Sequence, residues 1–487
     1  MSFIDGTAVN VALPILQRDL GAGTASVAWV VEGYSLFLAA LILIGGSLGD
    51  IFGRRAVFGA GVAVFAAASI VCGLAPNIEV LIVGRCVQGA GGALATPGSL
   101  ALISAALSGE ARGRAIGTWS GFSAITSALG PLLGGWLVGL GSWRYVFFIN
   151  APIALFVIAV LALRVDESRD ESAARRVDVG GAALATAGLG ALVYGLIRLQ
   201  GTTVDPAGFA AIAGGLLGLA AFAFVEARET HPMIRLDLFR SRAFTAANLY
   251  TFLLYAALGG SLYFLPFDLI NVQKYTPAQA GAALLPFIGI MFAFSRWSGG
   301  LTARIGARLP LALGGAFAAG GFALFALAGV GGSYWTTFFP GAVVLGLGGA
   351  LFVAPLTTTV MDAVPVAHAG VASGINNAVS RAAGLIAVAA LGIALAHVFD
   401  VSLARELGGV RIAPSTRAVL AREHGLVVGG QVPPALAASR DRETVAAAIA
   451  GSYAAGFRFA METAAVLSLL AAALALDGSF RRVPASR

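Results

Sequence analysis

Charged residues are scarce in this chain. Only 11% of its 487 residues are Asp, Glu, Lys or Arg, whereas 58% are hydrophobic. Soluble globular domains carry roughly 25% charged residues. The scarcity therefore excludes a soluble domain and predicts an all-α polytopic membrane protein. The 65 glycines agree with this prediction, because helices in a membrane pack closely through small residues.

Lysine is almost missing as well. Lys274 is the only one, so the net charge of +7 comes from arginine. Most arginines fall between apolar runs, which fits membrane topology better than a nucleic-acid surface, and we expect no nucleic-acid partner. The two cysteines, Cys72 and Cys86, both lie within apolar runs and predict no disulfide framework.

Several chemical signatures are absent from the sequence. It contains no Gly-x-x-x-x-Gly-Lys phosphate loop, no metal-ligand spacing and no pairing of a nucleophile with a base. These absences argue against an ATP-driven pump, a metal centre and an enzyme. A transporter of this kind would be driven by an ion or substrate gradient, so we expect a proton gradient as the driving force and no cofactor.

Apolar runs divide the chain into fourteen expected spans. The first, Phe3–Leu16, rises only about 21 Å as a helix, against a hydrocarbon core of about 30 Å. We expect this truncated span to continue upstream of the present start. The other spans are expected at about 27–48, 56–75, 78–104, 115–139, 143–163, 178–199, 207–226, 243–270, 278–298, 309–330, 334–360, 370–398 and 453–475.

The distribution of arginine predicts the orientation. An even number of spans places both termini on one side of the membrane. The loops on that side hold seventeen arginines, and the short opposite loops and their margins hold four basic residues. The long segment 399–452 on the opposite side carries six more arginines, but long loops translocate largely regardless of their charge. By the positive-inside rule, both termini are cytoplasmic, and we expect a multi-pass protein of the cytoplasmic (inner) membrane.

The spans predict three parts of the chain. Residues 1–165 form an N-terminal six-helix bundle, residues 166–242 hold cytoplasmic linkers with two extra transmembrane helices, and residues 243–487 form a C-terminal six-helix bundle. The extra pair is poor in polar groups and is interpreted as peripheral packing. Segment 399–452 is an expected external loop with two short helices, at Ser402–Leu407 and Arg442–Ala450.

A loop motif occurs once in each half of the chain. Gly46–Arg55 combines glycines with Asp50, Arg54 and Arg55, and a degenerate copy, Gly299–Arg308, follows 253 positions later without the acid. Two related halves are typical of transporters built from repeats. The first copy resembles the loop between helices 2 and 3 of the major facilitator superfamily. The resemblance implies that Asp50, Arg54 and Arg55 form a conformational latch at the cytoplasmic face.

Three further motifs extend the resemblance. Ile4–Pro14 resembles helix 1 of the 14-helix drug:proton antiporter branch of that superfamily, and Arg85–Ala93 resembles the helix 4 signature. The sequence from Gly130 to Gly135, Gly-Pro-Leu-Leu-Gly-Gly, resembles the antiporter motif of exporters, although Thr126 replaces a usual glycine. The resemblance implies two six-helix halves plus two extra central helices. The implied antiporter hinge consists of Gly130, Pro131, Gly134 and Gly135.

Ionisable side chains within the expected spans are functional candidates, because burying a charge in a membrane is costly. We assign Asp5, Glu32 and Arg85 to proton coupling. A guanidinium such as that of Arg85 holds a nearby carboxylate ionised until a conformational change separates them. Two alternatives remain open: Arg85 snorkels or binds backbone carbonyls, and Glu32 is a solvated residue at the external entrance.

A second group of polar and aromatic residues is assigned to a substrate pathway. These are Gln88, Asn248, Tyr255, Tyr263, Asp268, Asn376 and Asn377. Gln88 shares a helix face with Arg85, three positions away. Packing in the helix core is an equal alternative for the residues of the second half.

Together these features predict proton-coupled efflux, by antiport, of small amphipathic drugs or toxic compounds through alternating access. The expected partners are the substrate, protons and the lipid bilayer, and the protein is expected to be a monomer. Two alternatives stay open: an exporter of one specific native metabolite or antibiotic, and a non-transporting membrane sensor or scaffold on the same fold. Arg85 and the Gly130-Pro131 pair argue against the second alternative, because a scaffold needs neither.

Overall fold

The computed structural model describes residues 1–106, 122, 126, 129–169, 178–199, 205–229, 236–364, 369–477 and 480. These residues form helices and no strand, so the prediction of an all-α fold is confirmed. Within them, twelve helices are long and apolar enough to cross a membrane. Two expected spans are not among these twelve. The first span is α1 (Ser2–Asp19), and the fifth span is described mainly as the shorter helix Leu129–Gly139. The count of fourteen stays a prediction.

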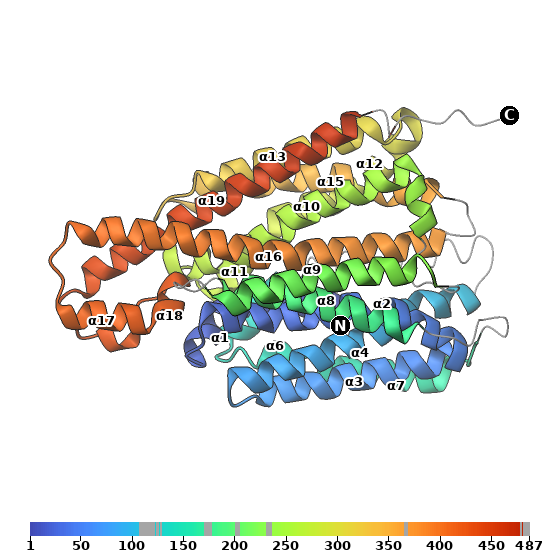
Figure 1. Cartoon of the computed structure of the whole chain (residues 1–487), viewed down its shortest axis with the longest axis horizontal. Helices are drawn as coiled ribbons and strands as arrows, with labels where there is room; N and C mark the ends of the chain where they lie inside the picture. Colours follow the sequence, from blue (N-terminus) through green and yellow to red (C-terminus); the bar gives the residue numbers. More distant parts are fainter. Residues whose placement is uncertain are drawn as a thin grey trace. The chain divides into compact units, whose positions relative to one another are not determined.

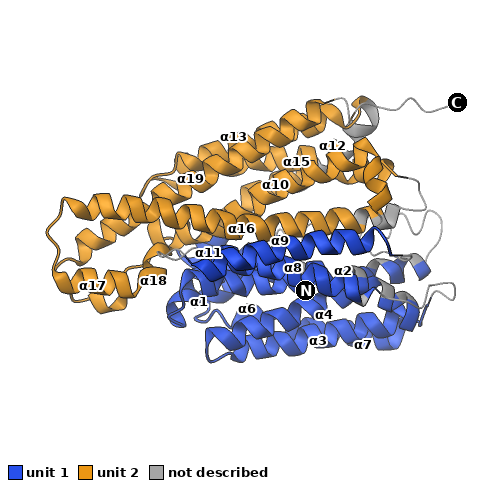
Figure 2. Cartoon of the chain, in the orientation of Figure 1, with its two compact units in different colours: residues 1–199, 203–234, 276–281 blue, residues 200–202, 235–275, 282–487 orange. Residues whose placement is uncertain are grey.

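The first compact unit comprises residues 1–199, 203–234 and 276–281 (Figure 2). Besides α1 and Leu129–Gly139, it contains α2 (Thr24–Phe52), α3 (Arg54–Leu74), α4 (Ile78–Ala106), α6 (Tyr145–Phe148), α7 (Asn150–Arg164), α8 (Val179–Arg198), α9 (Pro206–Glu226) and most of α11 (Pro277–Ala282) (Figure 1).

Within this unit, α4 packs against both α2 and α3 at van der Waals contact of the backbones. A Cβ atom on Gly45 of α2 would lie 2.1 Å from Ala93 O, and one on Gly89 of α4 would lie 2.3 Å from Tyr34 O. Only a hydrogen atom fits at either position, which is the usual reason for glycine at a close helix crossing. The crossing brings the side chains of α4 within reach of the carbonyl groups of α2.

The two extra helices, α8 and α9, form a hairpin that belongs to this unit. They also cross through glycine, since a Cβ on Gly195 would lie 2.6 Å from Gly208 O. One face of α8 lies on α2, where the rings of Trp29 and Tyr194 are 6.4 Å apart. The contact is made by apolar and aromatic groups, which agrees with the packing role expected for this pair.

The second compact unit comprises residues 200–202, 235–275 and 282–487 (Figure 2). Its elements are η1 (Leu236–Arg240), α10 (Arg242–Phe267), the π-helix η2 (Asp268–Val272), α12 (Leu285–Ile305), α13 (Arg308–Ala326), α14 (Tyr334–Thr337), α15 (Phe339–Asp362), α16 (Ala369–Gly408), α17 (Pro414–Arg422), α18 (His424–Val428), η4 (Pro434–Leu436) and α19 (Arg442–Leu476).

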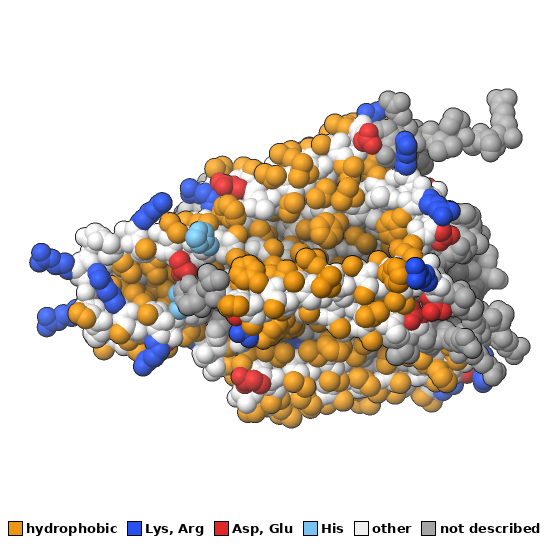
Figure 3. Space-filling view, in the orientation of Figure 1, with side chains coloured by type: hydrophobic (Ala, Val, Ile, Leu, Met, Phe, Trp, Pro, Cys, Tyr) orange, Lys and Arg blue, Asp and Glu red, His pale blue; other side chains and the backbone are white. Residues whose placement is uncertain are grey.

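The long loop of this unit differs from its prediction. Ser402–Leu407 and Arg442–Ala450 are not separate short helices, because α16 continues to Gly408 and α19 begins at Arg442. Helix α18 contacts both of these extended helices, and α17 packs against α18 (Figure 1). The segment 399–452 carries six arginines, and basic side chains project from the surface around α17 (Figure 3).

Asp441 fixes α17 within this segment. Its Oδ2 accepts hydrogen bonds from Thr416 Oγ1 at 2.7 Å and from Ala413 N at 2.8 Å. The Thr416 hydroxyl, together with the Ala413 amide, lowers the pKa of Asp441 below its ordinary value, because both bonds favour the carboxylate. The anchor is therefore present above the ordinary pKa of an aspartate and is lost only as the pH falls through the lowered value.

The two loop motifs occupy equivalent places in the two units. Gly53 separates α2 from α3 with a φ of 114°, and Gly306, 253 positions later, separates α12 from α13 with a φ of 81°. Residues with side chains rarely adopt such angles. The shared left-handed glycine supports the repeat inferred from the sequence.

Candidate functional site

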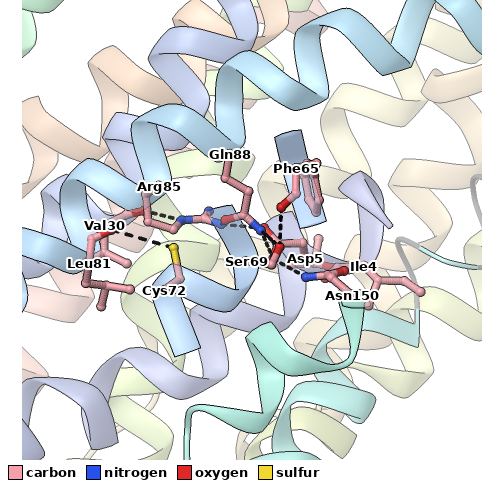
Figure 4. Close-up of polar contacts among 11 residues, drawn as sticks. Ile4, Asp5, Val30, Phe65, Ser69, Cys72, Leu81, Arg85, Gln88 and Asn150 are labelled. Atoms are coloured by element: carbon pink, nitrogen blue, oxygen red, sulfur yellow. Dashed lines mark hydrogen bonds and ion pairs between the residues drawn. The ribbon is translucent and has the colours of Figure 1, made fainter. Parts of the chain in front are cut away.

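Five buried polar side chains meet in the interior of the first unit (Figure 4). They come from four elements: Asp5 of α1, Ser69 of α3, Arg85 and Gln88 of α4, and Asn150 at the start of α7. Each is at most 1% exposed. The sequence placed Asp5, Arg85 and Gln88 among the candidates, and the structure brings these three together.

Arg85 is the centre of this cluster. Its Nη1 donates hydrogen bonds to Asp5 Oδ2 at 2.5 Å and to Gln88 Oε1 at 2.6 Å, and its Nε donates to Val30 O at 2.8 Å. The guanidinium carbon lies 4.2 Å from the centre of the Tyr34 ring, a cation–π geometry. Arg85 thus faces the interior and binds a carboxylate as well as a backbone carbonyl.

Asp5 is surrounded by donors. Its Oδ1 accepts hydrogen bonds from Gln88 Nε2 at 2.9 Å and from Asn150 Nδ2 at 3.0 Å, in addition to the Arg85 bond on Oδ2. Gln88 Nε2 also donates to Ser69 Oγ at 2.7 Å. A guanidinium and two amide groups stabilise the ionised carboxylate, which makes this buried pair tolerable.

Sequence reasoning missed Asn150 and Ser69. Asn150 belongs to a stretch, Trp143–Pro152, whose aromatic residues indicate an interfacial anchor without chemistry. It lies 145 positions from Asp5, and a neutral amide carries no charge signal. The only available hint was an asparagine at the beginning of an apolar helix.

Glu32 of α2 is the third proposed proton-coupling residue, and no contact that the structure describes joins it to this cluster. It is 1% exposed, so the alternative of a solvated entrance residue is wrong. Among the described residues, none forms a hydrogen bond with its Oε2. Glu32 and Asp5 are both buried acids, but their surroundings are opposite.

At the loop motif, the side chain of Asp50 lies outside the described part of the structure. The start of α3 is instead held by Glu167, whose carboxylate oxygens accept hydrogen bonds from Arg55 N at 2.9 Å and Ala56 N at 3.0 Å. Arg54 N donates to Ser168 O at 2.8 Å. A carboxylate at a helix N-terminus satisfies free amides and interacts well with the helix dipole. Sequence analysis missed Glu167, which lies 112 positions from Arg55.

Arg55 and Arg308 occupy equivalent positions in the two loop copies and make equivalent contacts. Arg55 Nη2 donates to Ala162 O, near the end of α7, at 3.1 Å. Arg308 Nη2 donates to Leu476 O, the last residue of α19, at 2.5 Å. Cations suit helix C-termini, where carbonyl groups lack partners. In each half, the loop arginine therefore donates a hydrogen bond to a carbonyl group at the C-terminal end of the last helix.

Replacing Glu167 with alanine is expected to loosen the start of α3 by about 0.5–2 kcal/mol, the usual loss when a capping side chain is removed. Hydrogen exchange at the amides of Arg55 and Ala56 should accelerate. Asp166→Ala is the matched control, because Asp166 is the exposed neighbour of Glu167 and does not cap α3. Equal exchange in the wild type and Glu167→Ala would argue against this role.

The four antiporter-motif residues are tightly packed. A Cβ on Gly130 would lie 1.8 Å from Thr7 Oγ1, and a Cβ on Gly134 would lie 2.4 Å from Ala8 O, so both face α1. Gly135 faces the other way, with its Cβ position 2.3 Å from Pro277 O in α11. The carbonyl of Pro131 also contacts α11, at 2.1 Å from the Cβ position of Gly281. Their role as a hinge stays a prediction.

In the second unit the structure joins two of the predicted pathway residues. Asn376 Nδ2 of α16 donates to Asn248 Oδ1 at 3.1 Å and to Thr251 Oγ1 at 2.6 Å, both on α10. Sequence reasoning missed Thr251. Asn377, the next residue of α16, is exposed.

The other pathway candidates of this unit lie elsewhere. Tyr255 packs against an apolar cluster of α10 and α16, and Tyr263 stacks with Phe264 and Phe267. Asp268 is twenty residues beyond Asn248 along a nearly continuous helix, which corresponds to about 30 Å. Asp268 therefore does not share a site with Asn248 and Asn376.

The sequence pattern of the Major Facilitator Superfamily matches residues 1–388, and the chain belongs to this family of membrane transporters. It is 36% identical over 459 residues to the multidrug resistance protein Stp of Mycobacterium tuberculosis, covering 92% of this chain and 84% of that protein. It is 34% identical over 487 residues to the tetracenomycin C resistance and export protein of Streptomyces glaucescens, covering 98% and 89%.

Solved structures agree on the fold. A bacterial homolog of the human lysosomal transporter Spinster, in an inward-facing and unoccupied conformation, superposes with a TM-score of 0.69 and 16% sequence identity. The match covers 99% of this chain and 96% of that one. The expected fold class is therefore confirmed as an all-α, multi-pass membrane fold of the major facilitator type.

Proposed function

We propose that this protein exports small amphipathic compounds across the cytoplasmic membrane in exchange for protons. Its relatives are named for resistance to or export of several compounds, among them tetracenomycin C, lincomycin and puromycin. The observation that carries the proton part of the proposal is the buried Asp5–Arg85 pair. In a transporter fold, a buried acid whose partner can move away is the simplest proton carrier.

The proposed cycle uses the ionised and protonated forms of Asp5. While Asp5 is ionised, Arg85, Gln88 and Asn150 hold it, and α1, α4 and α7 stay together. A proton on Asp5 removes the attraction to Arg85 and favours the alternative conformation, which faces the other side of the membrane. The proton gradient therefore shifts the equilibrium between the inward-facing and outward-facing states. Glu32, whose Oε2 has no hydrogen-bond partner among the described residues, is proposed as a second carboxyl that carries a proton during the cycle.

The orientation and assembly state are also proposals. The excess of arginine on one side supports cytoplasmic termini and places the loop motifs at the cytoplasmic face. A monomer with the lipid bilayer, protons and substrate as its partners is sufficient for alternating access. No cofactor is required when the proton gradient supplies the driving force.

Proton flux in proteoliposomes tests the proposed function. With a pH gradient across the vesicle membrane, puromycin, lincomycin or tetraphenylphosphonium should trigger proton movement that empty vesicles do not show. Responses to several of these compounds would indicate a multidrug exporter. A response to one compound would favour the narrower alternative, which the single-compound names of several relatives also support. No proton movement with any transported compound would contradict antiport.

A further inference from the structure

We propose that Asp268 is a further proton-binding site, located in the second unit and separate from both the Asp5–Arg85 cluster and Glu32. The inference rests on the proposed function in one respect, namely that protons drive transport. Asp268 begins the π-helix η2, directly after α10. Single π turns within membrane-spanning helices are rare and frequently occur at functional sites.

The surroundings of Asp268 favour a proton rather than a fixed charge. The side chain is 1% exposed, and its described hydrogen bond is with Gln273, whose Nε2 donates to Oδ2 at 3.1 Å. No arginine or lysine pairs with it among the described residues. A buried carboxylate without a cation is costly, whereas the protonated acid is tolerated. Asp5, which has Arg85 and two amides, presents the opposite case.

The titratable groups described near Asp268 do not provide it with a positively charged partner. Tyr453 of α19 and Tyr275, which follows the π-helix, lie within its electrostatic reach. The ammonium group of Lys274 is turned elsewhere and donates to Asn271 O. Tyr453 uses its hydroxyl to donate to Phe264 O at 3.1 Å. Among the described residues, Asp268 therefore has an amide as its hydrogen-bond partner and no paired cation.

Gln273 links this acid to the surface of the unit. It is itself partly exposed, and its amide is held at both ends: Nε2 donates to Gly329 O at 2.7 Å, and Oε1 accepts from Gly331 N at 2.9 Å. A buried acid that is one hydrogen bond from a partly exposed side chain can take up and release a proton without unfolding its helix.

The same π-helix is tied to the long loop of the second unit. Asn271 Nδ2 donates to Gly429 O, directly after α18, at 2.7 Å. A proton on Asp268 changes the charge at one end of this short element, and Asn271 joins the same element to the loop. The proposed proton site is therefore joined to the segment after α18 through one hydrogen bond of the same π-helix.

The test is Asp268→Asn in proteoliposomes with puromycin as the probe. With about one pH unit across the membrane, steady-state accumulation should fall about tenfold, because each coupled proton contributes a factor of ten per pH unit. Exchange of labelled puromycin without a gradient should stay within about twofold. Asp205→Asn, which removes an acid paired with Arg198 on the surface, should change neither measurement.

An infrared titration gives a second readout that does not depend on transport. The wild type should show a carbonyl band of a protonated carboxylic acid that is missing in Asp268→Asn and present in Asp205→Asn. Unchanged accumulation together with an unchanged band would overturn the proposal. If the wild type shows no proton-driven transport at all, the proposed function fails, and the infrared band alone decides whether Asp268 binds a proton.

Discussion

Asp5→Asn is expected to reduce proton-driven accumulation to the level of empty vesicles. Asparagine has nearly the same shape and can still accept hydrogen bonds from Gln88 and Asn150, but it cannot change its protonation state. It also leaves the guanidinium of Arg85 buried without its counter-charge. Breaking one partner of a buried ion pair costs about 3–5 kcal/mol, so a loss of stability accompanies the loss of coupling.

A double variant separates these two effects. Asp5→Asn combined with Arg85→Gln removes both charges, so that no uncompensated buried charge remains, and this charge is the main cost of breaking such a pair. The double variant should therefore regain the thermal stability of the wild type in detergent, while proton-driven accumulation stays absent. Recovery of accumulation in the double variant would remove the pair from the coupling mechanism. Glu32→Gln is a useful comparison with Asp5→Asn, because it also removes a buried acid, but one that has no described cation partner.

Gly134→Val is the second change with a large expected effect. The Cβ position of Gly134 is 2.4 Å from the carbonyl oxygen of Ala8, which is backbone and cannot rotate away. A valine there must push α1 away from the helix Leu129–Gly139. Overpacking of this kind costs about 1–3 kcal/mol or more. Because α1 carries Asp5, the displacement should also lower the transport rate by at least about tenfold.

The same helix offers a matched control. Gly139 has open space around its Cβ position, with no described atom within 4 Å beyond its chain neighbours and the backbone of its own helix. Gly139→Val should therefore keep both the stability and the transport rate near those of the wild type. Transport rates and melting temperatures of the two variants in the same vesicle preparation decide the matter. Equal behaviour of the two valine variants would show that the contact between Gly134 and Ala8 is not required.

The class of fold was predictable because membrane solvation acts on residue type. Long apolar runs and few charges exclude a soluble fold whichever helices become neighbours, and the loop copies around Gly53 and Gly306 indicate two related halves through their residue pattern alone. The abundance of glycines also predicted close helix packing. Their partners were not predictable, since Ala8 and Pro277 are more than one hundred positions from Gly134 and Gly135.

The candidate site was predictable only for its charged members. Asp5, Glu32 and Arg85 are notable in the sequence because an ionisable group in an apolar run is costly. Asn150 and Ser69 are not, because neutral polar groups are common in such helices. Sequence also treats Asp5 and Glu32 alike. The tertiary structure distinguishes them by their neighbours: Asp5 receives a guanidinium and two amides from α4 and α7, while Glu32 Oε2 receives no described partner. Whether a buried carboxyl is ionised or protonated depends on the groups within hydrogen-bond distance of it. Folding alone brings those groups together from distant parts of the chain.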